Sequence, residues 1–351
     1  MTLFNDLLPS DQVKSHFNFK KISSINISDS SYIAFQPNSD NIAVYFGNSD
    51  IEIWNWRNST IVKKLKIPDN TDGILSSQKL VFSQNGGLLA ACHTFSKMSS
   101  VVRIWETNNW KIIKDIEDPV PGNGCTATAF SPDGTQMALI GGRRIFEKAS
   151  TIRVFNTNNW QEIISLSTVP FQPYLVKYSN DGENLLIAGA VRNAVVWQGP
   201  GPQPVFGNPQ KPDGGYLSVI NLEKKEITKI IQLSQVPDVF GALSTGTTSD
   251  DIYFAGGTGI EQINIVKGES VVIRKPLTGS IRTSFEYAKD GKFSIDLVSS
   301  RDVNWFNIKD ENNNKLIYQS KKSMNCAALS PNNKFIATCE NNSVSIFEIN
   351  K

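Results

Sequence analysis

The residues best suited to recognition chemistry are basic and aromatic side chains in three long stretches, 93–100, 141–150 and about 191–215. An arginine pair can form forked hydrogen bonds to a carboxylate or phosphate, and aromatic side chains with arginine commonly anchor protein interfaces. The pattern predicts a contact surface, with solvated strand ends and a Trp197 packed under its own loop as the alternative. The candidate binding residues are Lys97, Arg143, Arg144, Phe146, Lys148, Arg192, Trp197, Phe206 and Lys211.

The rest of the sequence offers little for catalysis or metal binding. The chain has only two histidines, His16 and His93, and none of its four cysteines forms a CxxC pair. The glycine-rich segment 255–259 lacks a following helix or Lys-Ser/Thr pair, so it predicts a β-turn and not a phosphate cradle. The acidic pairs 250–251 and 310–311 are expected in solvated turns. We therefore expect no enzyme activity, no cofactor and no bound metal.

Charge and hydropathy narrow the class of protein further. The 35 Lys and Arg residues against 33 Asp and Glu leave a net charge of +2, which does not favour broad nucleic-acid binding. The sequence has no apolar run near the roughly 20 residues of a membrane span and no evident secretory signal. We expect a cytoplasmic protein with four buried thiols, Cys92, Cys125, Cys326 and Cys339. A disulfide between the last two, across the turn 330–333, stays open.

The elements that position these residues form an internal repeat along the chain. One recurring hairpin is an apolar run, a polar Asp-Gly or Asn-Gly type turn and a second apolar run. A second hairpin follows it, and residues 101–113 match 151–164 almost one for one. In this second hairpin polar residues alternate with β-branched ones, the period of a strand with two different faces. Copies of the first hairpin lie at 79–91, 126–140, 174–187 and 326–338.

Together the two hairpins make a unit of four antiparallel strands, which we call a to d. Seven units over 351 residues average about 50 residues each, the size of a propeller blade. The last unit stops after its third strand, and the strand-like segment 17–26 precedes the first, so we expect it to complete the last blade. The prediction is an all-β, seven-bladed β-propeller of four-stranded antiparallel blades, one domain over 1–351. The blades are expected near 31–67, 78–117, 124–168, 174–233, 240–275, 281–320, and 324–351 plus 17–26.

The chain resembles the WD-repeat (tryptophan–aspartate) propeller family over essentially its whole length. The resemblance rests on residues 130–134 (Phe-Ser-Pro-Asp-Gly) and on four third-strand endings, Trp54-Asn55, Trp105-Glu106, Phe155-Asn156 and Phe347-Glu348. The family's Gly-His dipeptide is absent, and Glu or Asn stands where the family has Asp. The family's buried His–Asp network is therefore not implied, and apolar packing between sheets is expected to stabilise the blades.

The three long stretches are b–c loops of blades two to four, so they lie at one end of the ring. Such loops favour a non-enzymatic scaffold that binds a protein partner. A propeller hydrolase or lactonase with a central-channel site is one alternative, although the inner strands are rich in small residues such as Ala127, Ala129, Ala327 and Ala328 and not in acids. Nucleic-acid or phospholipid binding by the basic loops is another. The order Gly142-Arg-Arg-Ile145 reverses the Phe/Leu-Arg-Arg-Gly motif of phosphoinositide-binding propellers, so that activity is not implied.

Overall fold

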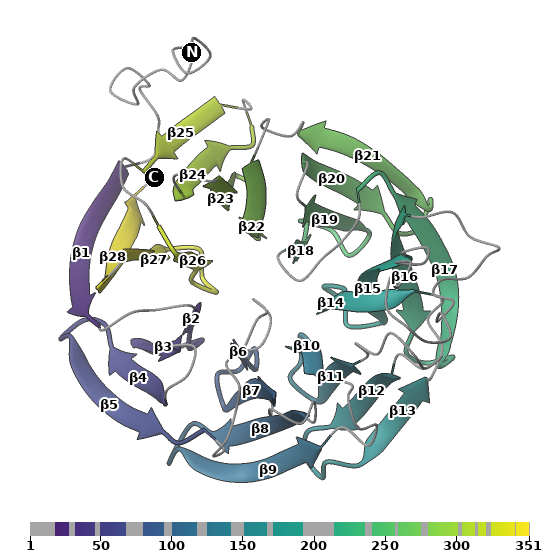
Figure 1. Ribbon diagram of the computed structural model, residues 1–351, viewed down its shortest axis with the longest axis horizontal. Coiled ribbons are helices and arrows are strands. Elements are labelled where there is room, and N and C mark those ends of the chain that lie inside the picture. Colours follow the sequence, from purple (N-terminus) through teal and green to yellow (C-terminus); the bar gives the residue numbers. More distant parts are fainter. Residues whose placement is uncertain are drawn as a thin grey trace, which may run out of the picture.

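A computed structural model gives the fold. It describes residues 18–27, 32–45, 50–67, 80–94, 100–117, 125–141, 151–166, 171–191, 214–235, 241–256, 259–274, 280–300, 304–312, 315–320, 324–340 and 342–350. These residues form 28 strands and no helix, grouped into seven four-stranded sheets. The sheets stand side by side around a common axis, so the chain makes a closed ring (Figure 1). The fold prediction is confirmed.

Blades one to six run outward from the axis in chain order, from strand a to strand d (Figure 1). Blade one is β2 (Tyr32–Phe35), β3 (Asn41–Tyr45), β4 (Ile51–Asn55) and β5 (Thr60–Leu65). Blade two is β6 (Leu80–Phe82), β7 (Leu88–Thr94), β8 (Ser100–Glu106) and β9 (Lys111–Glu117). Blade three is β10 (Cys125–Phe130), β11 (Gln136–Gly141), β12 (Thr151–Asn156) and β13 (Glu162–Leu166).

The remaining blades repeat this order. Blade four is β14 (Gln172–Tyr178), β15 (Asn184–Val191), β16 (Gly214–Asn221) and β17 (Glu226–Leu233). Blade five is β18 (Ala242–Thr245), β19 (Asp251–Gly256), β20 (Gly259–Asn264) and β21 (Glu269–Arg274). Blade six is β22 (Ser280–Tyr287), β23 (Phe293–Ser300), β24 (Asn304–Asp310) and β25 (Lys315–Gln319). Blade seven contains β26 (Cys326–Leu329), β27 (Phe335–Glu340) and β28 (Ser343–Asn350).

The outermost strand of blade seven comes from the other end of the chain. Strand β1 (Asn18–Asn26) pairs antiparallel with β28, from Phe19 opposite Ile349 to Ile25 opposite Val344, with a register shift between Lys21 and Ser23. Figure 1 shows β1, in purple, beside the yellow β28. Because Ile25 is fully buried between blades seven and one, the closing strand contributes to the core as well as to the sheet.

The repeated a–b turn follows directly from its sequence. In blade three the Ser131 hydroxyl donates to Asp133 (2.6 Å) and accepts from the backbone N–H of Gln136 (2.9 Å). Gly134 adopts a φ of 74°, which a residue with a Cβ rarely adopts. This local network makes the turn tight and uniform. The same Ser–Asx hydrogen bond joins Ser83 to Asn85, Ser179 to Asp181 and Ser330 to Asn332.

The core lies between the faces of neighbouring sheets. Trp105 of blade two, for example, is 1% exposed and belongs to a buried cluster with residues of blade one. Trp110 and Trp160 hold equivalent positions in the c–d turns, and both pack against such clusters, as their repetition predicts. Both tryptophans have a positive φ, 57° and 58°. The equivalent position in blade five is occupied by Gly268, which also has a positive φ. Inter-sheet packing therefore extends to the turns.

The prediction of four free thiols is wrong, although all four cysteines are buried. Cys326 and Cys339 lie opposite each other on β26 and β27 and form a disulfide, the alternative that the sequence left open. Cys92 of blade two and Cys125 of blade three form another, with their Cα atoms 5.9 Å apart. No local pattern indicates this link, because 33 residues separate the two cysteines and only the ring brings their strands together.

Candidate functional site

The nine candidate binding residues all lie outside the described residues, so their role stays a prediction. The strands that flank them are described. The β7–β8 ladder ends at Thr94 opposite Ser100, the β11–β12 ladder at Gly141 opposite Thr151, and the β15–β16 ladder at Val191 opposite Gly214. Each of the three connections therefore leaves a second strand and returns to a third strand at the same end of the ring.

His93 adjoins the first of these connections. It is fully buried and lies edge-on to the Trp105 ring, with 6.2 Å between ring centroids. This is the structural role expected for a lone histidine. Within the described part of the chain, no group of three or more His, Cys, Asp or Glu side chains is arranged to hold a metal ion. No helix in that part is long and apolar enough to cross a membrane.

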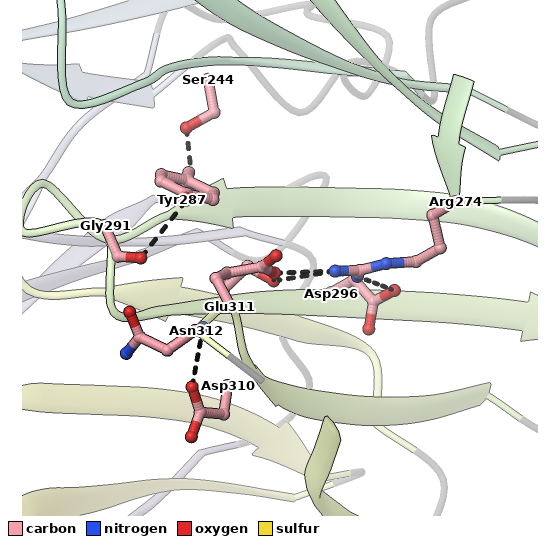
Figure 2. Close-up of polar contacts among 9 residues, drawn as sticks. Ser244, Arg274, Tyr287, Gly291, Asp296, Asp310, Glu311 and Asn312 are labelled. Atoms are coloured by element: carbon pink, nitrogen blue, oxygen red, sulfur yellow. Dashed lines mark hydrogen bonds and ion pairs between the residues drawn. The ribbon is translucent and has the colours of Figure 1, made fainter. Parts of the chain in front are cut away.

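The most connected ionic cluster joins blades five and six (Figure 2). Arg274, at the end of β21, forms an ion pair with Glu311 (2.7 Å) and lies 3.8 Å from Asp296. Ser294 donates a hydrogen bond to Glu311, while the Asp310 carboxylate accepts one from the backbone N–H of Asn312 (2.9 Å). The sequence predicts a solvated turn for the acidic pair 310–311. That expectation is wrong, because both carboxylates have partners within the protein. Since each carboxylate already has partners within the protein, the cluster is a joint between blades.

The two other segments that attracted attention in the sequence are structural. Gly256 and Gly259 lie directly opposite each other at the ends of β19 and β20, while residues 257–258 lie outside the described residues, so the β-turn expected there stays a prediction. Asp250 is exposed, and Asp251 accepts a hydrogen bond from the Thr248 hydroxyl (3.0 Å) within the same turn. The described residues of these two segments therefore pair with other parts of their own blade.

A different set of side chains gathers at the inner edge of the ring. The penultimate residue of strand a holds an equivalent place in every blade, beside the a–b turn. Four blades have a small apolar residue there: Ala34, Val81, Ala129 and Ala328. Three consecutive blades, four to six, instead have Lys177, Ser244 and Glu286, which we call the polar inner sector.

Two of the three residues hydrogen-bond to the next blade in the same way. Ser244 accepts from the backbone N–H of Tyr287 (2.9 Å), and Glu286 accepts from that of Leu329 (3.3 Å). Along an antiparallel strand, successive backbone N–H groups point to opposite sides. In each blade the next N–H, that of Ala288 or Ser330, donates to strand b. The N–H groups of Tyr287 and Leu329 therefore point away from strand b. Ser244 and Glu286 therefore satisfy backbone donors at the inner edge of the ring, which has no further strand.

One segment of the sequence matches the model of a known protein family. A family model described as "WD domain, G-beta repeat" matches residues 314–348, and the ring has the seven four-stranded blades that the resemblance implies. The chain is a seven-bladed β-propeller with one segment similar to a WD repeat. The matched segment runs from β25, the outer strand of blade six, into β28, so it is offset by one strand from the blades. No curated protein matches the sequence.

Electrostatics distinguish the polar inner sector from the rest of the propeller. Burial raises the pKa of Glu286 to about 7, and the nearby Lys177 acts in the opposite direction. Burial lowers the pKa of Lys177 from its usual value, while Glu286 opposes that shift. Burial and the like charge of Lys177 lower the pKa of Lys289, in the a–b turn of blade six. Three titratable groups are therefore coupled at one place.

The sequence did not indicate this group. The expectation that the inner strands lack acids is wrong for blade six, where Glu286 lies on β22. For Lys177 a signal was present, since aligning the residue two places before the Ser of each Phe-Ser-Pro-Asp-Gly-type turn places it in register with Val81, Ala129 and Ala328. Blades five and six have degenerate turns without that Ser, which hid the equivalence of Ser244 and Glu286.

Proposed function

We propose that this propeller is a non-enzymatic scaffold that binds a protein partner through the b–c connections of blades two to four. WD-repeat propellers commonly act in this way. The observation that carries the proposal is that three b–c connections, among them the two longest, leave adjacent blades at the same end of the ring. The a–b and c–d turns at the other end are short.

The composition of these connections supports a partner with an acidic surface. Between them they contain six basic side chains and the aromatic residues Phe146, Trp197 and Phe206. Arginine and aromatic side chains are enriched among the residues that dominate binding energy at protein interfaces. A rigid ring also lowers the entropic cost of presenting them, because the strands that carry the connections are already ordered. We further propose that the protein needs no cofactor and is cytoplasmic, a compartment in which its two disulfides would be unusual.

The test is affinity capture of the full chain with quantitative mass spectrometry. The double variant Arg143→Glu/Arg144→Glu is expected to lose its captured partners at least ten-fold. The matched control is Lys224→Glu/Lys225→Glu, which makes the same charge change on two exposed residues of the c–d turn at the other end of blade four. The control is expected to retain the partners. Retention by the Arg143/Arg144 variant contradicts the proposal.

A further inference from the structure

The fold accounts for two members of the polar inner sector but not for the third. Ser244 and Glu286 each supply an acceptor to a backbone N–H of the next blade. The equivalent N–H next to Lys177 belongs to Thr245, and it faces away from strand b because Gly246 donates to Asp251 there (2.7 Å). A lysine ammonium has only donors, so Lys177 cannot satisfy this N–H.

Lys177 also has no ionic partner at contact distance among the described residues. It forms none of the ion pairs or hydrogen bonds of that part of the chain, and its interaction with Glu286 is through space. Lys177 and Glu286 both remain partly accessible to solvent although they lie on innermost strands. An alanine, as in three other blades, would complete the packing, so packing alone does not explain a lysine here.

We propose that the polar inner sector is a binding site for a carboxylate group, which Lys177 binds as an ion pair at the a–b end of the ring. The Thr245 N–H is a second donor beside it. The exposed Lys289 adds a further positive charge to the same place.

The charges at the site favour a singly charged carboxylate over phosphate. Lys177 and Lys289 with an ionised Glu286 sum to one positive charge, which a monoanion neutralises. A phosphate dianion places more negative charge against Glu286, and like charges at short range are unfavourable.

The carboxylate comes either from a free small acid or from an acidic side chain of a peptide. Saturation-transfer NMR titrations of the full chain distinguish these sources with N-acetyl-alanine, which has one carboxylate, and with a Gly/Ser hexapeptide that is N-acetylated, C-amidated and has one central glutamate. The glutamine counterpart of this capped peptide is the third probe, and inorganic phosphate is the fourth. Binding of the glutamate peptide alone identifies a peptide ligand. Binding of both carboxylates identifies the carboxylate itself as the recognised group, and binding of N-acetyl-alanine alone identifies a small acid.

The variants test the assignment of Lys177. Lys177→Met is expected to weaken binding of the carboxylate probe at least ten-fold, whereas Lys63→Met, on the exposed rim strand β5, leaves it unchanged. Lys289→Met lies in an exposed turn that tolerates substitution, so it keeps the test valid if Lys177→Met fails to fold. It is expected to weaken binding about three-fold.

Three results overturn the inference: neither carboxylate probe binds, the glutamine peptide or phosphate binds as tightly as the carboxylates, or binding is unchanged in Lys177→Met and Lys289→Met. The site lies at the opposite end of the ring from the connections of the proposed function. Failure of this inference therefore leaves the scaffold proposal standing, and failure of partner capture by the loops leaves this site standing.

Discussion

Arg153 of blade three donates a hydrogen bond to the backbone carbonyl of Glu117, where the outer strand of blade two ends (3.1 Å). Its Nε also binds Glu162 on the outer strand of its own blade (2.5 Å). Arg103, one blade earlier, repeats the arrangement with the carbonyl of Lys66 (3.3 Å) and a forked pair to Asp115. Polar contacts at the rim therefore supplement the apolar packing that the sequence led us to expect between blades.

The first prediction concerns these two arginines. The double variant Arg103→Met/Arg153→Met is expected to lose about 2 kcal/mol of unfolding free energy, since each half-buried guanidinium makes charge-assisted bonds to two strands. Urea denaturation measures it. Lys64→Met is the control, because Lys64 is 57% exposed and its pair with Glu52 contributes less than about 0.5 kcal/mol. Equal effects in the two variants would show that the arginines do not join the blades.

The joint between blades five and six gives a second prediction. Arg274→Met leaves the side chains of Asp296 and Glu311, 5% and 13% exposed, without their cation. We expect a loss of about 3–5 kcal/mol, the usual cost of removing one partner from a buried ion pair. Adding Glu311→Gln to the variant is expected to restore part of that loss in the same denaturation assay. A double variant less stable than Arg274→Met contradicts the ionic account.

Two glycines with the same backbone conformation provide a matched pair. Gly86 and Gly268 have φ values of 75° and 77°, but a Cβ at Gly86 lies 2.4 Å from the carbonyl oxygen of Pro37 and one at Gly268 meets nothing within 4 Å. We expect Gly268→Ala to cost about 1 kcal/mol and Gly86→Ala clearly more, about 3 kcal/mol, because the first blade must shift. Thermal unfolding measures both. Similar melting temperatures contradict the close approach of blades one and two.

The polar inner sector predicts a pH dependence of stability. The folded pKa of Glu286, about 7, lies above its ordinary value of 4.5, so the folded state binds a proton that the unfolded state has released. Stability is therefore highest below 4.5 on this account and falls by up to about 3 kcal/mol as the pH rises to 7. Lys177 has the opposite sign, since its lowered pKa makes stability rise as the pH increases toward 10.5.

Glu286→Gln removes the acidic part of this dependence. Denaturation midpoints measured from pH 5 to 7.5 are expected to vary less in Glu286→Gln than in the unaltered chain. The unaltered chain is expected to lose stability over this range as Glu286 ionises. Two profiles that differ only by a constant offset contradict the assignment to Glu286.

The disulfides predict a thiol count. Denatured, unreduced protein is expected to show none of its four cysteines as free thiols, and reduced protein to show all four. Cys92→Ser is expected to cost about 4 kcal/mol and Cys339→Ser about 3 kcal/mol, because the first disulfide spans 33 residues and the second 13. Four reactive thiols before reduction contradict both links.

The repeats in the sequence predict the fold because each level agrees with the others. The Ser–Asx turn, the alternation of third strands such as 151–156 and the missing strand of the last unit are all local signals that only a closed ring satisfies together. The Cys92–Cys125 link and the partners of Arg274 could not be read in this way. They join different blades, so they depend on the spacing and tilt of neighbouring sheets.

The candidate site shows the same division. The sequence locates the long b–c connections because they interrupt a regular repeat. It does not reveal the polar inner sector, because a single Lys, Ser or Glu on a short strand has no local pattern, and its meaning comes from comparison with the alanines of other blades. Lys177 is seen to be unusual only when the equivalent positions of all seven blades are compared around the axis.

The central claim is that β1 closes the ring, since this closure fixes which strands line the axis and which connections share an end. Hydrogen–deuterium exchange of the full chain tests it directly. Amides of β1 from Phe19 to Ile25 that pair with β28 are expected to be as protected as those of β27, because both strands belong to the same sheet. Exchange of β1 within seconds, with β27 still protected, would contradict the closed ring.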